Sequence, residues 1–373
     1  MSATSNTAVP RAEVIGSMLR PGYLLDARVA VEAGEIGRPE FKRIEDRAVS
    51  EAIALQVEAG VDIVTDGEMR RGTWMGPLTE TIDGFGHVPG ELRTWYTEEG
   101  PQEEELPFVV TGKLQQRRSL VAEEFAGARE KVNADDSGRR LKMTIPSPLA
   151  LTLRWSPTVS TEAYENPFAM VADAVEIAQN AVAELVEMGC TDIQIDAPEL
   201  ATLIQAETRD WYAERGMPPE RMLSEGIDLI NAVTAIPGPR YGIHLCRGNG
   251  LGRWMAEGGY DYIAKALFER AKGFDLFLLE YDDHRSGDFE PLANVPDDKH
   301  VVLGLISSKK AELESADAII ARINEATNFI DRDRLSISTQ CGFASGYLGN
   351  PITEEVERAK LGLVAEVARE VWG

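Results

Sequence analysis

The sequence predicts a (β/α)₈ barrel, because short apolar runs rich in β-branched residues alternate with amphipathic segments along the chain. Eight such runs occur within 373 residues, and eight is the strand number of this closed barrel. A doubly wound open sheet is the alternative, and it would carry a G-x-G-x-x-G turn after an early strand. No such turn is found there, so the barrel is favoured.

The predicted strands and helices follow one another through the whole chain. The strands are expected at residues 13–17, 62–68, 142–146, 192–196, 241–246, 276–281, 300–307 and 335–341. The helices are expected at residues 43–59, 167–188, 219–233, 260–271, 312–328 and 354–372. Because the carboxyl ends of barrel strands form the active site, functional residues are expected at those ends.

A stretch rich in glycine and proline, at residues 81–119, interrupts this alternation. It is too long for an ordinary connection between a strand and a helix. We predict a hairpin-like insertion after the second strand, with residues 109–114 as one arm, that covers the active-site mouth or forms a contact in a homo-oligomer. No linker or repeat marks a second domain, so residues 13–373 are expected to form one barrel domain after a flexible tail, residues 1–12.

Charge and cysteine content restrict the function. The formal net charge is −24, from 38 Lys and Arg against 62 Asp and Glu, which argues against binding to nucleic acid. No run of about 18 apolar residues is found, so no membrane span is predicted. The N-terminus lacks the pattern of a signal peptide, and three cysteines are too few for a disulfide framework. A reducing, cytoplasmic location is therefore predicted.

Four residues at predicted strand ends are of the types that bind zinc. His244 and Cys246 are two apart on one strand, so their side chains point to the same face. Glu280 and Cys341 end two later strands. Two thiolates, an imidazole and a carboxylate suit a tetrahedral zinc site. The third cysteine, Cys190, is interpreted as a buried core residue.

The charge of these ligands indicates the chemistry. Hydrolytic zinc sites usually keep neutral histidine ligands, so that the ion can ionise water. Two thiolates and one carboxylate would leave a formal charge of −1 on the site, which makes it a poor source of hydroxide. Such a site can still bind a substrate thiol as a nucleophilic thiolate. The residues therefore predict alkylation of a thiol.

Seven motifs resemble the catalytic half of cobalamin-independent methionine synthase and the short single-barrel proteins related to it. In chain order they are Ile15-Gly16-Ser17, Thr65-Asp66-Gly67-Glu68, Ile193-Gln194-Ile195-Asp196, His244-Leu245-Cys246-Arg247-Gly248-Asn249, Leu279-Glu280-Tyr281-Asp282, Ser286-Gly287-Asp288-Phe289-Glu290-Pro291-Leu292 and Cys341-Gly342-Phe343. They cover nearly the whole chain. The resemblance implies a (β/α)₈ barrel with zinc on a His, Cys, Glu, Cys set, in agreement with the interpretation above.

The resemblance also implies substrate contacts. Ser17 and the adjacent backbone would hold the carboxylate of homocysteine, while Glu68 and Asp196 would accept its ammonium group, as a zwitterion requires. Trp155 would lie beneath the pterin of a folate donor. Asp196 and the ligand Glu280 are the residues expected to take part in catalysis.

Charged residues near these motifs allow more than one interpretation. Arg70, after Glu68, either steers an anionic donor group or pairs with the acidic surface. Arg247, next to a predicted zinc ligand, could approach a carboxylate, a phosphate or a sulfonate. Lys309 and Lys310 are interpreted as surface residues.

The sequence departs from the full-length enzymes in three ways. Ala197 follows Asp196 where the family motif usually has glutamate, and Glu199 lies one step beyond the motif. Ser307 ends the seventh strand, where the full-length enzymes place a histidine thought to relay a proton to the leaving group. The N-terminal barrel of those enzymes has no counterpart here. These departures leave the methyl donor open.

Three functions follow as hypotheses. The first is a methyltransferase in which a zinc-bound homocysteine thiolate attacks a methyl group carried by methyltetrahydrofolate, by a corrinoid protein or by another small molecule. The second is a zinc alkyltransferase that uses another thiol, such as epoxyalkane:coenzyme M transferase, whose sulfonate substrate would need Arg or Lys in the pocket. The third is a zinc protein without turnover.

Overall fold

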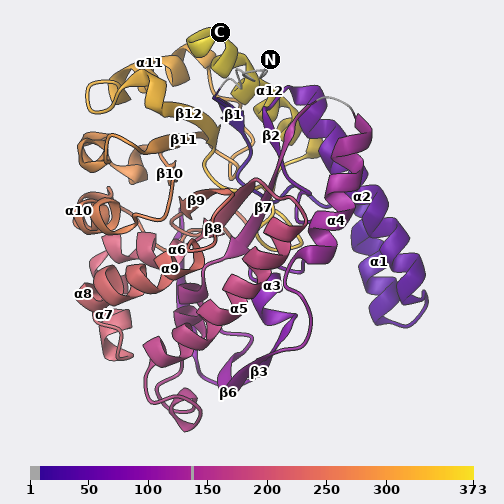
Figure 1. Cartoon of the computed structure of the whole chain (residues 1–373), viewed down its shortest axis with the longest axis vertical. Coiled ribbons are helices and arrows are strands. Elements are labelled where there is room, and N and C mark those ends of the chain that lie inside the picture. The colour runs from indigo at the N-terminus through magenta and orange to yellow at the C-terminus, as the bar shows by residue number, and fades with distance from the viewer. Residues whose placement is uncertain (1–8, 136–137) are drawn as a thin grey trace.

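The computed structural model describes residues 9–135 and 138–373, and its centre is a closed barrel of eight parallel strands, as predicted (Figure 1). Around the barrel the order is β1-β12-β11-β10-β9-β8-β7-β2. The strands are β1 (Ala12–Glu13), β2 (Ile63–Val64), β7 (Arg140–Pro146), β8 (Asp192–Asp196), β9 (Arg240–Leu245), β10 (Leu276–Glu280), β11 (His300–Ile306) and β12 (Leu335–Thr339). Most of the expected N-terminal tail, residues 1–8, lies outside the described residues.

The strand register determines which residues meet at the carboxyl end of the barrel. Strands β8 and β10 are buried at every position, because helices cover the outside and side chains fill the inside. Asp196, at the end of β8, is the register partner of His244 on β9. The ends of these strands therefore place a carboxylate and an imidazole side by side.

Helices surround the strands in the regular βα order (Figure 1). They are α1 (Gly22–Glu32), α2 (Arg38–Ala59), α3 (Gly76–Thr79), α4 (Ala122–Asp135), α5 (Pro167–Glu187), α6 (Pro198–Ala201), α7 (Ala206–Glu214), α8 (Pro219–Arg221), α9 (Ile227–Val233), α10 (Asp261–Arg270), α11 (Ala316–Ala326) and α12 (Glu354–Trp372). The helix predicted at residues 219–233 has these bounds in the structure, where a π-helical turn, Met222–Gly226, joins α8 to α9. None of the helices formed by the described residues is long and apolar enough to cross a membrane.

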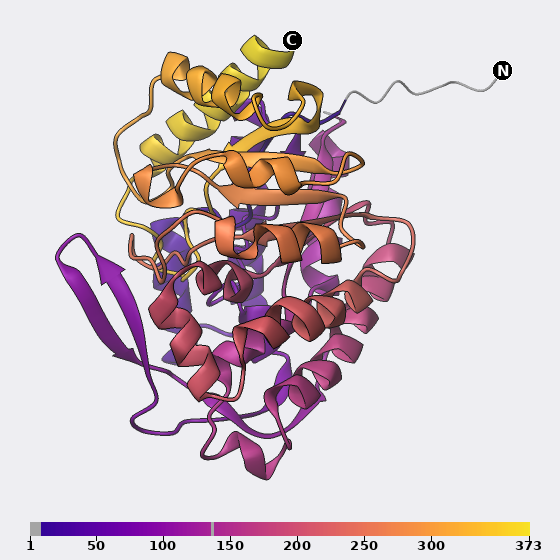
Figure 2. The same ribbon diagram turned by 90° about the vertical axis from the view of Figure 1, so that its left-hand side faces the viewer.

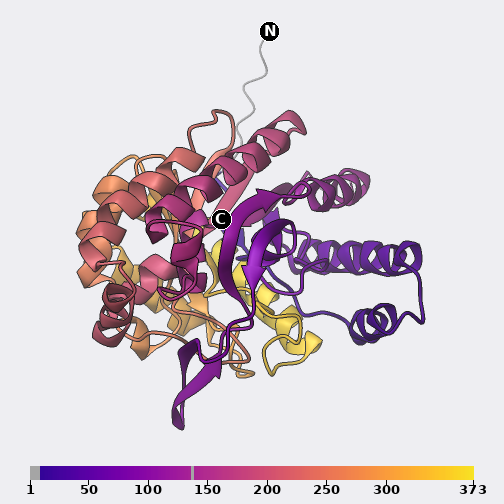
Figure 3. The same cartoon turned by 90° about the horizontal axis from the view of Figure 1, so that it is seen from below.

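The insertion after β2 consists of two antiparallel ribbons. Strand β6 (Val109–Gln116), which contains the predicted arm, pairs with β3 (Ile82–Gly86). Between them, β4 (Leu92–Thr97) and β5 (Gly100–Glu105) form a second hairpin, which projects beyond the body of the barrel in Figures 2 and 3. Tyr96 of β4 exchanges two backbone hydrogen bonds, 2.7 and 3.1 Å long, with Trp254 in the loop after β9. The insertion is therefore tied to the active-site end of the barrel.

Candidate active site

The ends of two strands bring His244, Cys246 and Cys341 together. Their ligand atoms all lie within 4.8 Å of one another, and all three side chains are buried. His244 is on β9, Cys246 follows the end of that strand by one residue, and Cys341 follows β12 by two. The alternation of side chains along a strand explains why His244 and Cys246 face the same centre.

The imidazole of His244 is oriented for metal binding. Its Nδ1 atom lies 3.3 Å from the carbonyl oxygen of Leu278, and its Nε2 atom is buried without a hydrogen bond. With a proton on Nδ1 donated to this carbonyl, the lone pair on Nε2 is directed to the cysteines, which is the usual support of a metal-binding histidine. The donor set of one imidazole and two sulfurs fits zinc.

The pKa values of the two thiols are shifted in opposite directions. A hydrogen bond from Cys246 lowers the pKa of Cys341 well below its usual value, against the effect of burial, and the neighbouring His244 and Lys309 lower it further. The same hydrogen bond, together with burial, raises the pKa of Cys246. The cluster therefore stabilises a thiolate at Cys341, the form in which cysteine binds metals.

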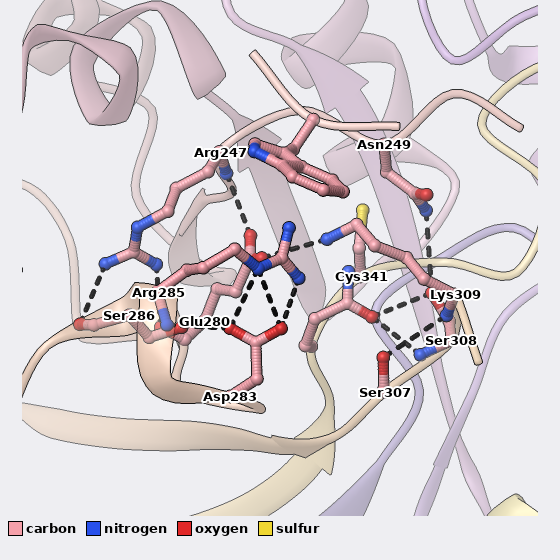
Figure 4. A network of polar contacts seen from close by, with 12 residues as sticks. Arg247, Asn249, Glu280, Asp283, Arg285, Ser286, Ser307, Ser308, Lys309 and Cys341 are labelled. Atoms are coloured by element: carbon pink, nitrogen blue, oxygen red, sulfur yellow. Dashed lines mark hydrogen bonds and ion pairs between the residues drawn. The ribbon is translucent and has the colours of Figure 1, made fainter. Parts of the chain in front are cut away.

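Glu280 lies next to this cluster but outside the 4.8 Å group. Its Oε1 atom accepts a hydrogen bond from Nζ of Lys309 at 2.9 Å, and its Oε2 atom accepts one from the backbone N–H of Arg247 at 2.8 Å (Figure 4). Although burial opposes it, these two cations lower the pKa of Glu280. The fourth predicted ligand is thus an ionised carboxylate held beside the cluster.

Two interpretations of cations were wrong. Lys309, expected at the surface, is buried with 2% of its side chain exposed, because it neutralises Glu280. Arg247, considered as a partner for a substrate anion, donates instead to the carbonyl oxygens of Gly258, Glu280 and Ser286 (Figure 4). Its guanidinium therefore supports the loops around the cluster.

The predicted homocysteine-binding residues line the same pocket as the cluster. Ser17, Glu68 and Asp196 share this pocket with His244 and Cys341. Burial, opposed by the nearby imidazole of His244 and reinforced by the charge of Glu68, raises the pKa of Asp196 to about 7. A cationic ligand would stabilise the ionised form of this carboxyl group.

The backbone around Glu68 is shaped to present its carboxylate. Glu68 has a φ of 54°, in the left-handed region that non-glycine residues rarely adopt. Oε1 accepts a hydrogen bond from the Thr144 hydroxyl at 2.8 Å, whereas Oε2 is buried without a hydrogen bond. A Cβ atom on Gly16 would lie 2.6 Å from Oε1, so Gly16 is needed for this close approach.

The two predicted donor-binding residues lie elsewhere. Trp155 is buried in the hydrophobic core and is not among the residues that line the pocket. Arg70 forms ion pairs with Glu45 and Asp46 on α2 and lines a separate cavity. In this conformation neither residue faces the cluster.

Other residues, which the sequence interpretation missed, line the pocket in their place. They are Trp74, Trp95, Arg93 and Arg154. Arg93 and Trp95 alternate along β4 of the insertion, so they face the same side. This i, i+2 pattern was visible in the sequence, but it acquires a meaning only when the insertion is known to fold over the mouth.

The fold and the pocket define a class of protein: a (β/α)₈-barrel enzyme with a buried group of one histidine and two cysteines, residue types that can hold a metal ion, at the carboxyl ends of its strands. The family described as "Cobalamin-independent synthase, Catalytic domain" matches residues 11–222 and 268–370. The chain belongs to this family, that of the cobalamin-independent methionine synthases, and is a methyltransferase.

Individual relatives agree with this assignment. The chain is 34% identical to an uncharacterized protein of Bacillus subtilis, YxjG, over 97% of this chain and 94% of that protein. It is 26% identical to a methionine synthase of Saccharolobus solfataricus, over 88% and 86%. The crystal structure of a putative vitamin-B12 independent methionine synthase from Listeria monocytogenes is similar, with a TM-score of 0.73 and 28% identity, over 99% of this chain and 100% of that one.

Proposed function

We propose that this methyltransferase is zinc-dependent and methylates the thiol of homocysteine. One observation carries the proposal: the His244, Cys246 and Cys341 cluster opens into the pocket that Ser17, Glu68 and Asp196 line. A cluster that suits a soft metal thus lies beside groups that suit an amino acid.

The side chains of His244, Cys246 and Cys341 would hold the zinc ion, with Glu280 as the fourth ligand. When bound, zinc would favour the ionised form of a substrate thiol near neutral pH. Lys309 would hold Glu280 beside the cluster through the ion pair seen at 2.9 Å. Because that pair is buried, its geometry is well fixed.

The remaining residues would bind and orient the amino-acid part of the substrate. Glu68 offers an oxygen, Oε2, that lacks a hydrogen bond, and an ammonium group would satisfy it. Asp196 would share that cation, which would favour its ionised form. Ser17, buried next to the Cys341 loop, would hold the carboxylate. These contacts fix the sulfur in one position, and fixed geometry accounts for part of the catalysis.

The number of histidines in the pocket bears on the identity of the methyl donor. Of the four in the chain, His244 is the one that lines the pocket. Ser307 directly follows the seventh barrel strand, β11, where full-length enzymes resembling this chain place a histidine. A methyl donor that leaves without protonation by an imidazole, such as a methylated corrinoid carried by a partner protein, therefore suits the pocket at least as well as methyltetrahydrofolate.

A second candidate thiol is coenzyme M, which has a sulfonate and no amine. Arg93 and Arg154 in the pocket favour it, because guanidinium groups bind sulfonates. Glu68 and Asp196 favour homocysteine, because they would repel a sulfonate.

Isothermal titration of the zinc-loaded protein with each thiol, in two buffers of different ionisation enthalpy, tests the proposal. Homocysteine binding with release of about one proton is the expected result. Binding of coenzyme M alone would replace homocysteine by the second candidate. Binding of neither thiol would overturn the proposal and favour a zinc protein without thiol chemistry.

A further inference from the structure

Two arginines without a carboxylate partner lie in the wall of the active-site pocket. Arg93 comes from β4 of the insertion, and Arg154 ends the 3₁₀ turn (Pro148–Arg154) that follows β7. Neither makes an ion pair with a carboxylate within the described parts of the chain. Their guanidinium groups lie over aromatic rings instead, Arg93 at 5.9 Å from Trp95 and Arg154 at 4.9 Å from Phe108. The Nε atom of Arg154 is also buried without a hydrogen bond.

These arginines lie between the metal cluster and the mouth. Both line the pocket that contains the cluster, and both also line the wider cavity that adjoins it. Ser17, by contrast, lines the inner pocket and not the outer cavity. Arg93 and Arg154 therefore lie where the inner pocket and the outer cavity adjoin, within reach of a second substrate that extends from the cluster to the mouth.

Placing two arginine cations this close together in the pocket wall is energetically unfavourable. Burial, together with the repulsion from Arg93, lowers the pKa of Arg154 to about 10. The carboxyl group that raises the pKa of Arg93 is that of Glu199, whose own pKa burial raises to about 8. This carboxyl group is mostly neutral at pH 7 and cannot serve as a full counter-ion. In a chain with 62 acidic and 38 basic residues, many carboxylates were available to neutralise these arginines, so their isolation indicates a ligand.

We propose that Arg93 and Arg154 form a subsite for an anionic group of the second substrate, the methyl donor. The inference rests on the proposed function, because it assumes that a thiol occupies the inner pocket. A carboxylate, sulfonate or phosphate fits, since two guanidinium groups can bind each of these by charge-assisted hydrogen bonds. The insertion then has a role in selecting the donor, because it supplies one of the two arginines.

Sulfate binding tests the subsite directly. Isothermal titration of sulfate into the zinc-loaded protein, with and without homocysteine, is compared for wild type, Arg93→Gln and Arg154→Gln. We expect wild type to bind sulfate and each variant to bind it about tenfold or more weakly, since each loses a charge-assisted contact. Arg253→Gln is the matched control, because Arg253 lines the outer cavity but is already paired with Glu104 at 2.9 Å.

Homocysteine and its decarboxylated analogue 3-aminopropane-1-thiol distinguish the source of the anion. Unchanged affinity of both thiols in the arginine variants supports a donor subsite. A loss confined to homocysteine would assign the arginines to the carboxylate of the thiol and overturn the proposal. Equal sulfate affinity in wild type and both variants, or no sulfate binding by wild type, would also overturn it. Failure of the proposed function shows separately, as absence of proton release when wild type is titrated with homocysteine. Arg154→Lys, which keeps the charge, should retain part of the sulfate affinity if the glutamine variants are folded.

Discussion

The two ends of the barrel differ in how completely their buried polar groups are paired. At the amino end, Lys142 donates to Glu13 at 2.6 Å and to the carbonyl oxygen of Val14 at 2.8 Å. Asp192 receives Arg140 and Arg240 at 2.7 and 3.0 Å. Each of these ionised groups therefore has a partner of opposite charge, as buried charges require.

At the carboxyl end, Lys309 pairs with Glu280 and Arg71 with Glu68, but several buried polar atoms lack hydrogen bonds. Among them are Oε2 of Glu68, Nε2 of His244, both carboxyl oxygens of Glu199 and Oδ1 of Asn249. Each such atom costs about 1–3 kcal/mol if it stays unsatisfied. The chain tolerates this cost at the end of the barrel where substrates bind, which indicates that ligands complete these contacts.

This difference between the two ends predicts that the amino end determines stability and the carboxyl end determines ligand binding. Substitutions at the amino end should lower the free energy of unfolding and leave ligand binding unchanged. Substitutions at the carboxyl end should lower ligand binding, and some of them should stabilise the fold.

The largest effect is expected for Cys341→Ala. Removal of this thiolate should reduce the metal content from about one zinc per chain to near zero and reduce methyl transfer to background, because structural and catalytic zinc sites need their full ligand sets. Metal analysis after gel filtration measures the first effect. Cys190→Ala is the control, since Cys190 is a buried core cysteine whose thiol donates a hydrogen bond to the carbonyl oxygen of Asp192. Zinc retained in full by Cys341→Ala would refute the metal site.

The next largest effect is a loss of stability, expected for a substitution at the amino end of the barrel. Lys142→Met should lower the free energy of unfolding by about 3–5 kcal/mol, because it leaves Glu13 buried without a counter-ion. Urea denaturation measures this loss. The double variant Glu13→Gln, Lys142→Met should recover much of it, and zinc content should stay that of wild type in both. A parallel fall in zinc content of the folded variants would show that the two ends are not independent.

Glu68→Gln should act on binding rather than on stability. The amide keeps the shape and the contact with the Thr144 hydroxyl, but it cannot neutralise an ammonium group. Homocysteine affinity should fall about tenfold to a hundredfold, since a hydrogen bond to a charged group contributes about 1.5–3 kcal/mol. Calorimetry with coenzyme M, which has no amine, is the control. An equal loss for both thiols would contradict the assignment of Glu68 to the ammonium group.

The sequence predicted the regular parts of this molecule well. Strand β8 was predicted at its observed bounds, Asp192–Asp196, because its two isoleucines alternate with polar residues between the turn residues Gly189 and Pro198. The convergence of His244, Cys246 and Cys341 followed from the rule that strand ends meet at one end of a barrel. Such predictions succeed where local pattern and topology agree.

Side-chain direction could not be predicted in the same way. Lys309 was interpreted as a surface residue, yet it pairs with Glu280. Arg247 was considered as a ligand-binding cation, yet its guanidinium binds carbonyl oxygens. Arg93 reaches the pocket only because the insertion folds back over the mouth, through contacts such as that between Tyr96 and Trp254. Long-range packing of this kind leaves no periodic signal in the sequence.

The smallest effect, and the most direct test of the cost at the carboxyl end, is the pH dependence of Glu199→Gln. Burial, together with the charge of Asp196, raises the pKa of Glu199 in the folded protein to about 8. In the unfolded chain the pKa is about 4.3. Between these values the folded protein holds a proton that the unfolded chain releases, so the stability of wild type should fall as pH rises from about 5 to 8.

Glutamine does not titrate, so this fall should be smaller in Glu199→Gln by up to about 1 kcal/mol per pH unit. Urea denaturation at pH 5.5, 6.5 and 7.5 measures the difference between the two proteins, which should grow with pH and level off above about pH 8. A constant difference across this range would mean that Glu199 is already satisfied in the folded state. The contrast between the two ends would then rest on the remaining atoms, such as those of Glu68, His244 and Asn249, and the cost of these unpaired atoms would be smaller than their number suggests.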